Sequence, residues 1–410
     1  MRGVMRIAIL GLGLLAVSVA GLRAEDWPRW RGAYFNGVSP ETGWVAAWPR
    51  EGPRRLWTAN VSTGFCAVAI KAGRLFTLGN SNNTDTVWAF DAERGHVLWK
   101  YSYPCKLDPN LYEGGPNATP TVNLDRVYTL SKEGLLLCFR AVSGQMLWQK
   151  HLVTDFGVKR PEWGFASSPT VVGEQLVLNA GGAGLAVHKI TGELLWCADK
   201  GPGAYASPLP VTVAGKHAYC FLSHRDLIAV GADGPNAGVV LWRHPWKTSY
   251  DMSVPDAVVY RNLLFVSSFG QPGTLFDLRP ADPKPVWQCK DFWQHISTPV
   301  LVNGHLYGFH GDATKGNELK CVEFATGQVK WTEPNLPNGG LTAAGGKLIV
   351  LTGNGELIVA DASPAGFKPI SRTQVLGGKC WTVPVLANRL IYCRNARGDL
   401  VCLDVRPKSP

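Results

Sequence analysis

A short phrase, a turn glycine followed four residues later by tryptophan, recurs along the chain and constrains its fold more than any other feature. It stands at 94–100 (RGHVLWK), 143–149 (SGQMLWQ), 191–197 (TGELLWC) and 326–332 (TGQVKWT). Tryptophans end such runs, or similar ones, at intervals of 42, 49, 48, 46, 45 and 44 residues. A period near 45 without a helical pattern is the length of one four-stranded propeller blade. The seven tryptophans are Trp57, Trp99, Trp148, Trp196, Trp242, Trp287 and Trp331.

One unit can be followed strand by strand between residues 167 and 196. Two short Val- and Leu-rich runs, SSPTVVG (167–173) and EQLVLNA (174–180), are followed by a GGAG turn. The runs LAVHKI (185–190) and LLW (194–196), separated by a TGE turn, complete the unit. Short apolar runs bounded by Gly, Pro, Ser or Asn are typical of strands. The chain is therefore predicted to be all-β.

The number of units follows from their beginnings, of which the sequence has eight. They open near Cys66, Ala118, Ser167, Ala206, Ser253, Ser297, Leu341 and Thr382. The seventh has SRTQVL (371–376) where tryptophan is expected, and the eighth has no room for a fourth strand. Upstream, RRLWTAN (54–60) is a fourth strand without a first. If this N-terminal strand completes the last blade, the ring closes and exposed sheet edges disappear. We predict an eight-bladed propeller of four-stranded antiparallel blades, with seven blades as the alternative.

The repeated tryptophan is interpreted as structural. A catalytic residue is seldom needed seven times at equivalent places, whereas a large flat side chain can seal every blade against the next. Burial of each such side chain contributes roughly a few kcal/mol. We therefore expect these seven side chains to dock one blade on another.

The repeats resemble a known motif. AFDAERGHVLW (89–99), CFRAVSGQMLW (138–148) and CVEFATGQVKW (321–331) are similar to the tryptophan-docking repeat of pyrroloquinoline-quinone-like (PQQ-like) propellers, and DWPRWRG (26–32) resembles the start of secreted bacterial members. The resemblance covers about residues 54–405. It implies the fold but no single activity, because the family contains quinone-dependent dehydrogenases, outer-membrane assembly scaffolds and members without an assigned function.

The first residues are predicted to be a secretory signal peptide. MRGVMR is basic, IAILGLGLLAVSVAGL is apolar, and LRAED offers a cleavage region, with a cut after Ala24 preferred and after Ala20 as the alternative. The apolar run of about 16 residues is short for a membrane span, and no later segment is apolar enough to be one. The expected organisation is a signal peptide at 1–24, an extended strap at 25–53, one propeller domain at 54–405 and a tail at 406–410. The protein is expected to be periplasmic or extracellular.

Charge excludes one class of partner. Loss of Arg2, Arg6 and Arg23 with the signal peptide lowers the formal net charge from +10 to +7, since residues 1–24 hold no acid. The remaining basic residues are scattered, and no basic stripe interleaved with aromatic residues indicates nucleic-acid binding. We expect a monomer.

A cofactor site is not evident in the sequence. The resemblance to quinoprotein dehydrogenases implies calcium held by Glu, Asn and Asp, a catalytic Asp and often a disulfide between adjacent cysteines, yet the chain has no Cys-Cys pair. No catalytic or metal-binding residue is predicted, and PQQ with calcium is kept as an alternative. The lone carboxylates, none in a recognisable ligand pattern, are Asp108, Glu113, Asp155, Asp251, Asp291 and Asp312.

The ten cysteines fall into two groups. Five occupy strand positions where other units have small residues and are interpreted as packing residues: Cys138, Cys220, Cys321, Cys393 and Cys402. The other five lie at strand ends or in loops, and one or two disulfides among them would suit an exported protein, with the pairing left open: Cys66, Cys105, Cys197, Cys289 and Cys380.

A binding face is predicted where the long loops between blades gather. Segments 101–115, 154–165, 243–251 and 289–295 join a fourth strand to the next first strand and carry aromatic side chains. These loops should crowd one mouth of the central channel. The function predicted is a non-enzymatic binding or scaffold module with a protein or glycan partner in the cell envelope; the alternatives are a quinoprotein oxidoreductase and a glycan-binding propeller. The residues expected on this face are Trp163, Phe165, Tyr205, Trp293, His295 and Trp381.

Overall fold

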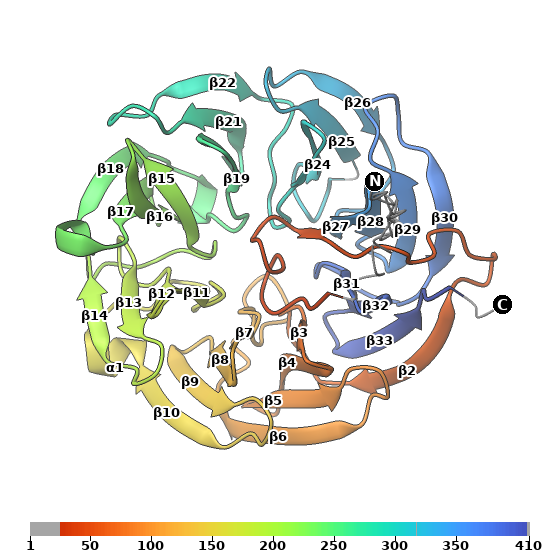
Figure 1. Cartoon of the computed structure of the whole chain (residues 1–410), viewed down its shortest axis with the longest axis horizontal. Coiled ribbons are helices and arrows are strands. Elements are labelled where there is room, and N and C mark those ends of the chain that lie inside the picture. Colours follow the sequence, from red (N-terminus) through yellow and green to blue (C-terminus); the bar gives the residue numbers. More distant parts are fainter. Residues whose placement is uncertain (1–24, 317, 408–410) are drawn as a thin grey trace, which may run out of the picture.

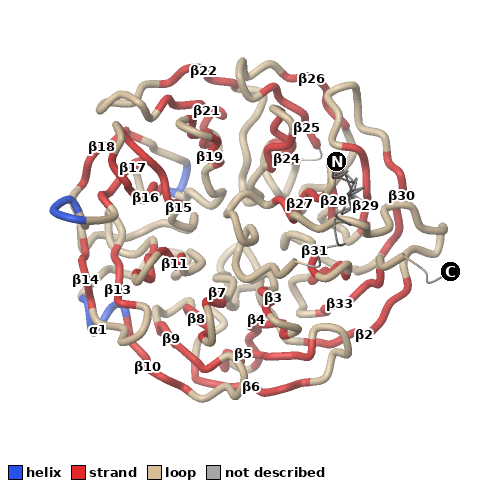
Figure 2. The backbone as a smooth tube through the Cα atoms, viewed as in Figure 1, coloured by secondary structure: helices blue, strands red, loops and turns tan. Residues whose placement is uncertain are grey.

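The structure is a ring of eight antiparallel blades, as the repeat count predicts. The computed structural model describes residues 25–316 and 318–407. Regular structure in these ranges is almost entirely strand (Figure 2), and the helical segments are short: α1 (Leu152–Phe156), η1 (Gly234–Asn236) and η2 (Ser249–Asp251). Eight sheets surround one axis (Figure 1). The eight-bladed prediction is confirmed and the seven-bladed alternative is wrong. The predicted signal peptide and residues 408–410 lie outside the described residues.

The first four blades follow the chain in order. Blade 1 contains β3 (Ala69–Lys71), β4 (Arg74–Ser81), β5 (Thr84–Asp91) and β6 (Val97–Pro104). Blade 2 contains β7 (Thr121–Asn123), β8 (Arg126–Leu130), β9 (Leu135–Arg140) and β10 (Met146–His151). Blade 3 contains β11 (Thr170–Val172), β12 (Gln175–Leu178), β13 (Leu185–His188) and β14 (Leu194–Cys197). Blade 4 contains β15 (Leu209–Val213), β16 (Lys216–Leu222), β17 (Asp226–Gly231) and β18 (Val240–Pro245).

The last four blades include two departures from this order. Blade 5 contains β19 (Val258–Tyr260), β20 (Leu263–Ser268), β21 (Gln271–Asp277) and β22 (Pro285–Cys289). Blade 6 contains β23 (Val300–Val302), β24 (His305–His310), β25 (Glu318–Glu323) and β26 (Val329–Glu333). Blade 7 contains β27 (Gly340–Ala344), β28 (Lys347–Leu351), β29 (Glu356–Asp361) and β30 (Pro369–Gln374), with β1 (Val38–Ser39) parallel to β27. Blade 8 contains β31 (Val385–Ala387), β32 (Leu390–Arg394), β33 (Asp399–Asp404) and, as its outer strand, the N-terminal β2 (Arg54–Asn60), which pairs antiparallel with β33.

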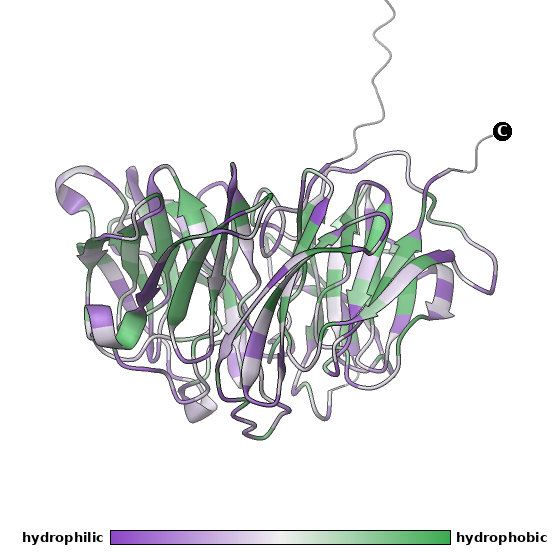
Figure 3. Cartoon of the chain, turned by 90° about the horizontal axis from the view of Figure 1, so that it is seen from below, coloured by the Kyte–Doolittle hydropathy of each residue, from purple (hydrophilic) through white to green (hydrophobic). Residues whose placement is uncertain are grey.

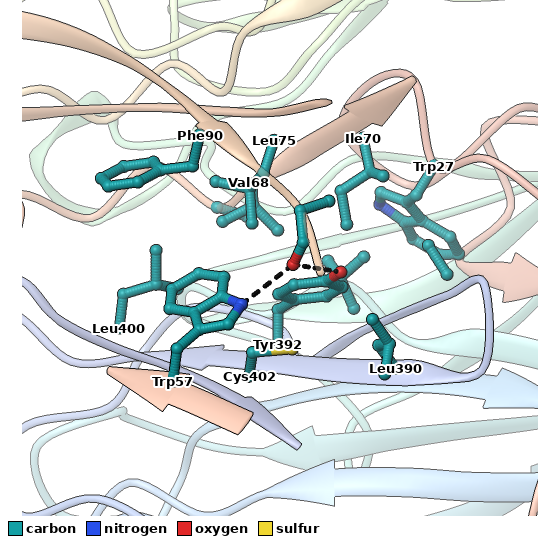
Figure 4. Close-up of a cluster of buried hydrophobic side chains, with 14 of the residues drawn as sticks. Trp27, Trp57, Val68, Ile70, Leu75, Phe90, Leu390, Tyr392, Leu400 and Cys402 are labelled. Carbon is teal, nitrogen blue, oxygen red and sulfur yellow. Dashed lines mark hydrogen bonds between the residues drawn. The ribbon is translucent and has the colours of Figure 1, made fainter. Parts of the chain in front are cut away.

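The repeated tryptophan contacts the following blade. In five of the seven cases the indole N–H donates to a backbone carbonyl of the next blade, as Trp57 does to Ala92 at 3.0 Å and Trp99 does to Ala141 at 2.9 Å. Tyr392 donates to the same Ala92 carbonyl at 3.1 Å (Figure 4). The other three pairs are Trp148 with Lys189, Trp287 with Phe324 and Trp331 with Ser363. At these five junctions the docking is thus both an apolar contact and a directed hydrogen bond.

The turn glycine of the phrase receives the tryptophan of the preceding blade. A Cβ added to Gly144 would lie 2.6 Å from the Trp99 ring, and one on Gly192 would lie 2.9 Å from the Trp148 ring. Both glycines have positive φ, 72° and 74°. Glycine is therefore required twice, for the backbone conformation and for the space that the indole occupies.

The two requirements can be separated by measurement. Gly73, in the first turn of blade 1, has φ 71° but no atom within 4 Å of an added Cβ. Gly73→Ala should therefore carry only the backbone cost of about 1 kcal/mol. Gly144→Ala should lower the free energy of unfolding by about 1–3 kcal/mol more, as measured from denaturant midpoints. Equal losses in the two variants would contradict the docking role of Trp99.

Side-chain oxygens also join the blades around the channel. The backbone N–H at the start of one inner strand donates to a side-chain oxygen of the next blade, as from Ala67 to Thr119 and from Thr119 to Ser168. The chain of bonds continues from Ser168 to Ser207, from Ser207 to Asp256 and from Asp256 to Thr298. In these five links Asp256 stands where the other blades have Ser or Thr. The Ser/Thr residues in the segments ATPTV, SSPTV, ASPLP and STPVL thus link neighbouring blades.

Residues 25–53 form a strap across one face of the ring. In Figure 1 this red segment crosses the middle of the ring. Its hydrogen bonds reach the inner strands of blades 1, 2, 3, 7 and 8. Trp27 bridges Ile70 of blade 1, and β1 pairs with β27 of blade 7. In the middle of the strap, the Trp30 indole donates to Asp256 Oδ2 at 2.6 Å. The buried Arg31 guanidinium donates to the Pro299 carbonyl at 3.0 Å.

The strap also fills the one blade junction that lacks a docking tryptophan. Ser371 lies opposite Val359, the register position that Trp99 takes opposite Ala89 in blade 1. The Trp48 backbone N–H donates to Ser371 Oγ at 3.0 Å. Trp44, Ala46 and Trp48 pack on the apolar cluster shared by blades 7 and 8. The strap therefore supplies at this junction the aromatic bulk that SRTQVL omits.

The buried Asp256 predicts a specific pH dependence. Burial raises the pKa of Asp256 to about 6, although Arg31 and the donors on Ser207 and Trp30 oppose the shift. Because the folded-state pKa lies above the unfolded one, stability is gained as pH falls through 6. Relative to Asp256→Asn, the wild type should gain about 2 kcal/mol of unfolding free energy between pH 7.5 and 4.5, measured by denaturant titration. A difference that does not change with pH would contradict this assignment.

Candidate binding face

The long loops between blades lie on the face opposite the strap. The strap contacts the inner-strand ends and the turns that follow them, such as Ala72 and Asn388. Because each blade has four antiparallel strands, the segments that join a fourth strand to the next blade leave from the other end of the strands. Seen edge-on in Figure 3, the ring has loops on both faces. The propeller therefore has a strap face and a loop face.

Five aromatic side chains form a continuous row on the loop face, which we call the aromatic row: Trp381, Phe65, Tyr112, Trp163 and Tyr205. Ring centroids are separated by 5.7 Å between Trp381 and Phe65, 5.4 Å between Phe65 and Tyr112, and 6.3 Å between Tyr112 and Trp163. The Trp163 backbone N–H donates to the Tyr205 hydroxyl at 3.3 Å. The first four are half-buried and Tyr205 is buried. The row joins loops that begin or end in blades 8, 1, 2, 3 and 4.

The apolar surface at the centre of the row continues into solvent. Leu111 precedes Tyr112 and is 86% exposed, more than any other large apolar side chain of the described residues. Its backbone has φ 60°, a conformation that leucine adopts at a cost. An apolar side chain held in water on a loop is a feature that a partner could cover.

Ion pairs flank the row on both sides. Lys379 Nζ lies 4.4 Å from the Trp381 ring and pairs with Glu113 at 2.9 Å. Lys132 Nζ lies 4.8 Å from the Tyr112 ring and 3.4 Å from Asp108 Oδ2. Burial opposes the charge of Asp108, but Arg160 and Lys132 outweigh it and lower the pKa of that carboxyl. These charges are already paired, so they frame the row without giving it a strong net sign.

A second aromatic cluster lies across the face, on blades 5 and 6. The Phe269 ring centroid is 4.4 Å from His295 and 5.6 Å from Trp293, and Trp293 contacts His310 at 5.4 Å. The predicted face residues are therefore split between two places. Trp163, Tyr205 and Trp381 lie in the aromatic row, Trp293 and His295 lie in this second cluster, and Phe165 is buried beneath the surface at 1% exposure.

The two histidines of this cluster are held by backbone amides. The Ala313 N–H donates to Nδ1 of His295 at 3.1 Å, and the Trp293 N–H donates to Nδ1 of His310 at 3.1 Å. Burial lowers the pKa of both rings. A neutral imidazole whose Nδ1 accepts a hydrogen bond carries its proton on Nε2. The Nδ1 lone pair of His310 is therefore occupied, whereas Nδ1 of His295 also lies 3.3 Å from Asp312 Oδ1, a contact in which Nδ1 would be the donor.

The carboxylates do not assemble into a metal site. Among the described residues, no group of three or more His, Cys, Asp or Glu side chains lies close enough to hold a metal ion. Calcium takes six to eight oxygen ligands. Five of the six carboxylates named in the sequence analysis instead bind nearby cationic or polar groups, and Asp291 accepts a hydrogen bond through its backbone carbonyl. Asp108, Glu113 and Asp251 pair with cations, Asp155 accepts from His151 N, Asp312 accepts from Thr314, and the Asp291 carbonyl accepts from Lys320.

The cysteines are all free thiols. Every one of the ten lies in the described ranges and none is disulfide-bonded. The five assigned to packing are buried, as are Cys66, Cys105 and Cys380, while Cys197 and Cys289 are partly exposed. Burial raises the pKa of Cys105 to about 12, with Asp85 as a second cause. A thiol with such a pKa is protonated at neutral pH and unreactive.

Four residues of the two clusters were not among those predicted for this face. Phe65 and Tyr112 belong to the aromatic row, and Phe269 and His310 to the second cluster. Tyr112 stands inside the loop 101–115, so its segment was identified although its contacts were not. Phe65 precedes Cys66, where the first unit opens. Their contacts join loops of different blades, which no spacing within one repeat encodes.

Comparisons with known proteins agree with the fold. BamB from Moraxella catarrhalis is 13% identical, covers 86% of this chain and 99% of its own, and superposes with a TM-score of 0.62. A europium-containing methanol dehydrogenase is 12% identical over 90% of this chain and 88% of its own, with a TM-score of 0.68. The quinohemoprotein alcohol dehydrogenase of Comamonas testosteroni is 13% identical over 94% and 81%, also with 0.68. At such identities the likeness shows the fold alone.

Family membership rests on the sequence itself. No curated protein matches the chain at a significant level. In the part that the structure describes, no helix is long and apolar enough to span a bilayer. The family model described as outer membrane protein assembly factor BamB matches residues 106–234 and 226–408. The chain therefore belongs to this family of PQQ-like β-propellers.

Proposed function

We propose that this chain is an exported, non-enzymatic propeller that binds a protein partner of the cell envelope through the aromatic row. One observation carries the proposal: Leu111 is held 86% exposed beside a row of contacting aromatic rings. Aromatic residues at the centre and paired charges at the rim are the usual composition of a protein interface. The family description, which names an assembly factor, supports a partner of this kind.

The occupant that fits is an extended peptide segment with apolar side chains. The row runs across several loops instead of enclosing a pocket, so it offers length more than depth. Its flanking cations are already paired with Asp108 and Glu113, which gives little advantage to an acidic ligand. Contact with Leu111, Tyr112 and Trp163 would desolvate apolar surface, the main favourable term in such association.

A matched pair of leucines tests the proposal without disturbing the core. Leu111 on the loop face and Leu124 on the strap face are 86% and 74% exposed, with φ of 60° and 53°. A displayed library of random 12-residue peptides, panned on the wild type, should yield apolar sequences. Leu111→Ser and Trp163→Ala should weaken the selected peptides about tenfold or more, measured by interferometry, while Leu124→Ser should leave binding unchanged.

The same residues can be examined in the exporting cell. A photo-crosslinking amino acid at position 111 should give a discrete protein adduct, and one at position 124 should not. Retention of the wild type on a polysaccharide resin, lost in Trp163→Ala, together with failure of the peptide selection, would replace the protein partner by a glycan.

The oxidoreductase alternative makes an opposite prediction. Reconstitution with PQQ and calcium should give no dye-linked oxidation of alcohols or sugars, because Asp108 and Glu113 are held by cations and His295 by an amide. Calcium-dependent dye reduction above the protein-free control would overturn the non-enzymatic assignment.

A further inference from the structure

A buried carboxylate in the strap lacks a partner for one of its two oxygens. Glu41 is 0% exposed. Its Oε1 accepts the backbone N–H of Glu25 at 2.7 Å and also that of Asn388. Its Oε2 is buried and has no hydrogen-bond partner among the described residues. An acceptor left this way costs about 1–3 kcal/mol, more when it is charged, so the geometry calls for a further donor at this place.

The backbone nitrogen of Glu25, which already donates to Oε1 of Glu41, is positioned to be this donor. The backbone is fixed from this residue onward: the Asn388 N–H donates to the Glu25 carbonyl at 3.3 Å, and Trp27 exchanges two hydrogen bonds with Ile70 at 3.0 and 2.7 Å. Asp26 pairs with Lys71 at 3.0 Å. The Glu25 nitrogen is therefore held beside Glu41, because Glu25 and the two residues after it are bound to blades 8 and 1.

The same nitrogen follows a predicted cleavage site. Ala24 and Ala20 are both small residues that could precede a signal-peptide cut. The cut after Ala24 is the preferred prediction, and the cut after Ala20, preceded by Ser18 in a small-x-small pattern, is the alternative. The two cuts differ physically: only a cut after Ala24 changes the nitrogen that faces Glu41 from an amide into an amine.

We propose that hydrolysis of the Ala24–Glu25 bond creates an α-ammonium that forms a buried ion pair with Glu41 and locks the strap onto the propeller. Water, added by a protease of the signal-peptidase class, leaves a carboxylate on Ala24 and the ammonium on Glu25. The amide supplies one N–H, which Oε1 already accepts, whereas the ammonium supplies three and satisfies Oε2 as well. Burial raises the pKa of Glu41, although the backbone N–H groups of Glu25, Asn388 and Arg389 and the charge of Arg389 oppose the shift. A second cation stabilises its charged form.

This ion pair would act on the whole ring. Glu41 lies between β1, which pairs with blade 7, and Trp48, which fills the junction of blades 7 and 8. Asn388, which also donates to Glu41, lies in the first turn of blade 8. Removal of the signal peptide would thus strengthen the attachment of the strap to blades 7 and 8.

Chains that differ by one residue test the proposal. A fusion cleaved without residual residues gives the protein starting at Glu25, and a second gives it starting at Ala24, which displaces the ammonium by about 3.8 Å. The Glu25 chain should melt about 2–5 °C higher. Glu41→Gln should abolish the difference, whereas Glu51→Gln, on an exposed acid of the strap, should preserve it.

Two further readouts do not depend on the Glu41 variant folding. The ion pair should slow acylation of the Glu25 α-amine about tenfold relative to that of the Ala24 chain, followed by mass spectrometry. The charged groups around this nitrogen are Glu41, Arg389, Asp26 and Lys71. Because pairing raises the amine pKa in the folded state, the melting difference should shrink as pH rises above 8.

The protein purified from an exporting cell completes the test. Its N-terminal residue should be Glu25. A mature N-terminus at Gly21, or equal melting and acylation of the Glu25 and Ala24 chains, would overturn the proposal. Neither result would affect the peptide-binding experiment, since the aromatic row lies on the opposite face.

Discussion

Docking of one indole on the next blade is the interaction on which the ring depends. A four-stranded blade has two apolar faces and cannot bury both alone. At each of five junctions an indole donates to a carbonyl of the following blade, and at five of the seven tryptophans the following blade has a glycine directly against the indole. In this arrangement a turn formed by neighbouring residues of one blade packs against a side chain of another blade. Within one phrase, the glycine receives the indole of the preceding blade and the tryptophan docks on the following blade, which explains why the two residues recur together.

The sequence was sufficient for the fold because this constraint is periodic. Eight inner-strand beginnings and an orphan outer strand at RRLWTAN were visible as departures from a regular count, and β2 pairs with β33 in the structure. The position of Ser371 was equally visible as a missing tryptophan. What fills its place was not, because Trp48 reaches it from 323 residues away through an irregular strap that has no repeat to align.

The candidate face was predictable in position but not in arrangement. The repeat fixes which ends of the strands carry the long loops, and so placed Trp163, Tyr205 and Trp381 on one face. The repeat could not show that Trp293 and His295 form a separate cluster. Equivalent positions in two blades lie at the same height on the ring, but they lie on different sides of its axis. The contacts of Phe65 with Tyr112 and Trp381 come from loops of unequal length. Phe165 shares its offset with His295, yet it is buried because Gly134 leaves room for its ring.

The strap connects the places where the symmetry of the repeat is broken. Among the side-chain oxygens that join blades 1 to 6, Asp256 is the acid, and its second oxygen accepts from Trp30 of the strap. Ser371 replaces a docking tryptophan and accepts from the Trp48 backbone. A regular repeat would have a hydroxyl at the position of Asp256 and an indole at that of Ser371, and it would lack these two hydrogen bonds to the strap. Two positions at which the propeller departs from its repeat are therefore positions that bind residues 25–53. The strap closes one mouth of the channel, which leaves the loop face as the surface where the unrepeated residues can meet a partner.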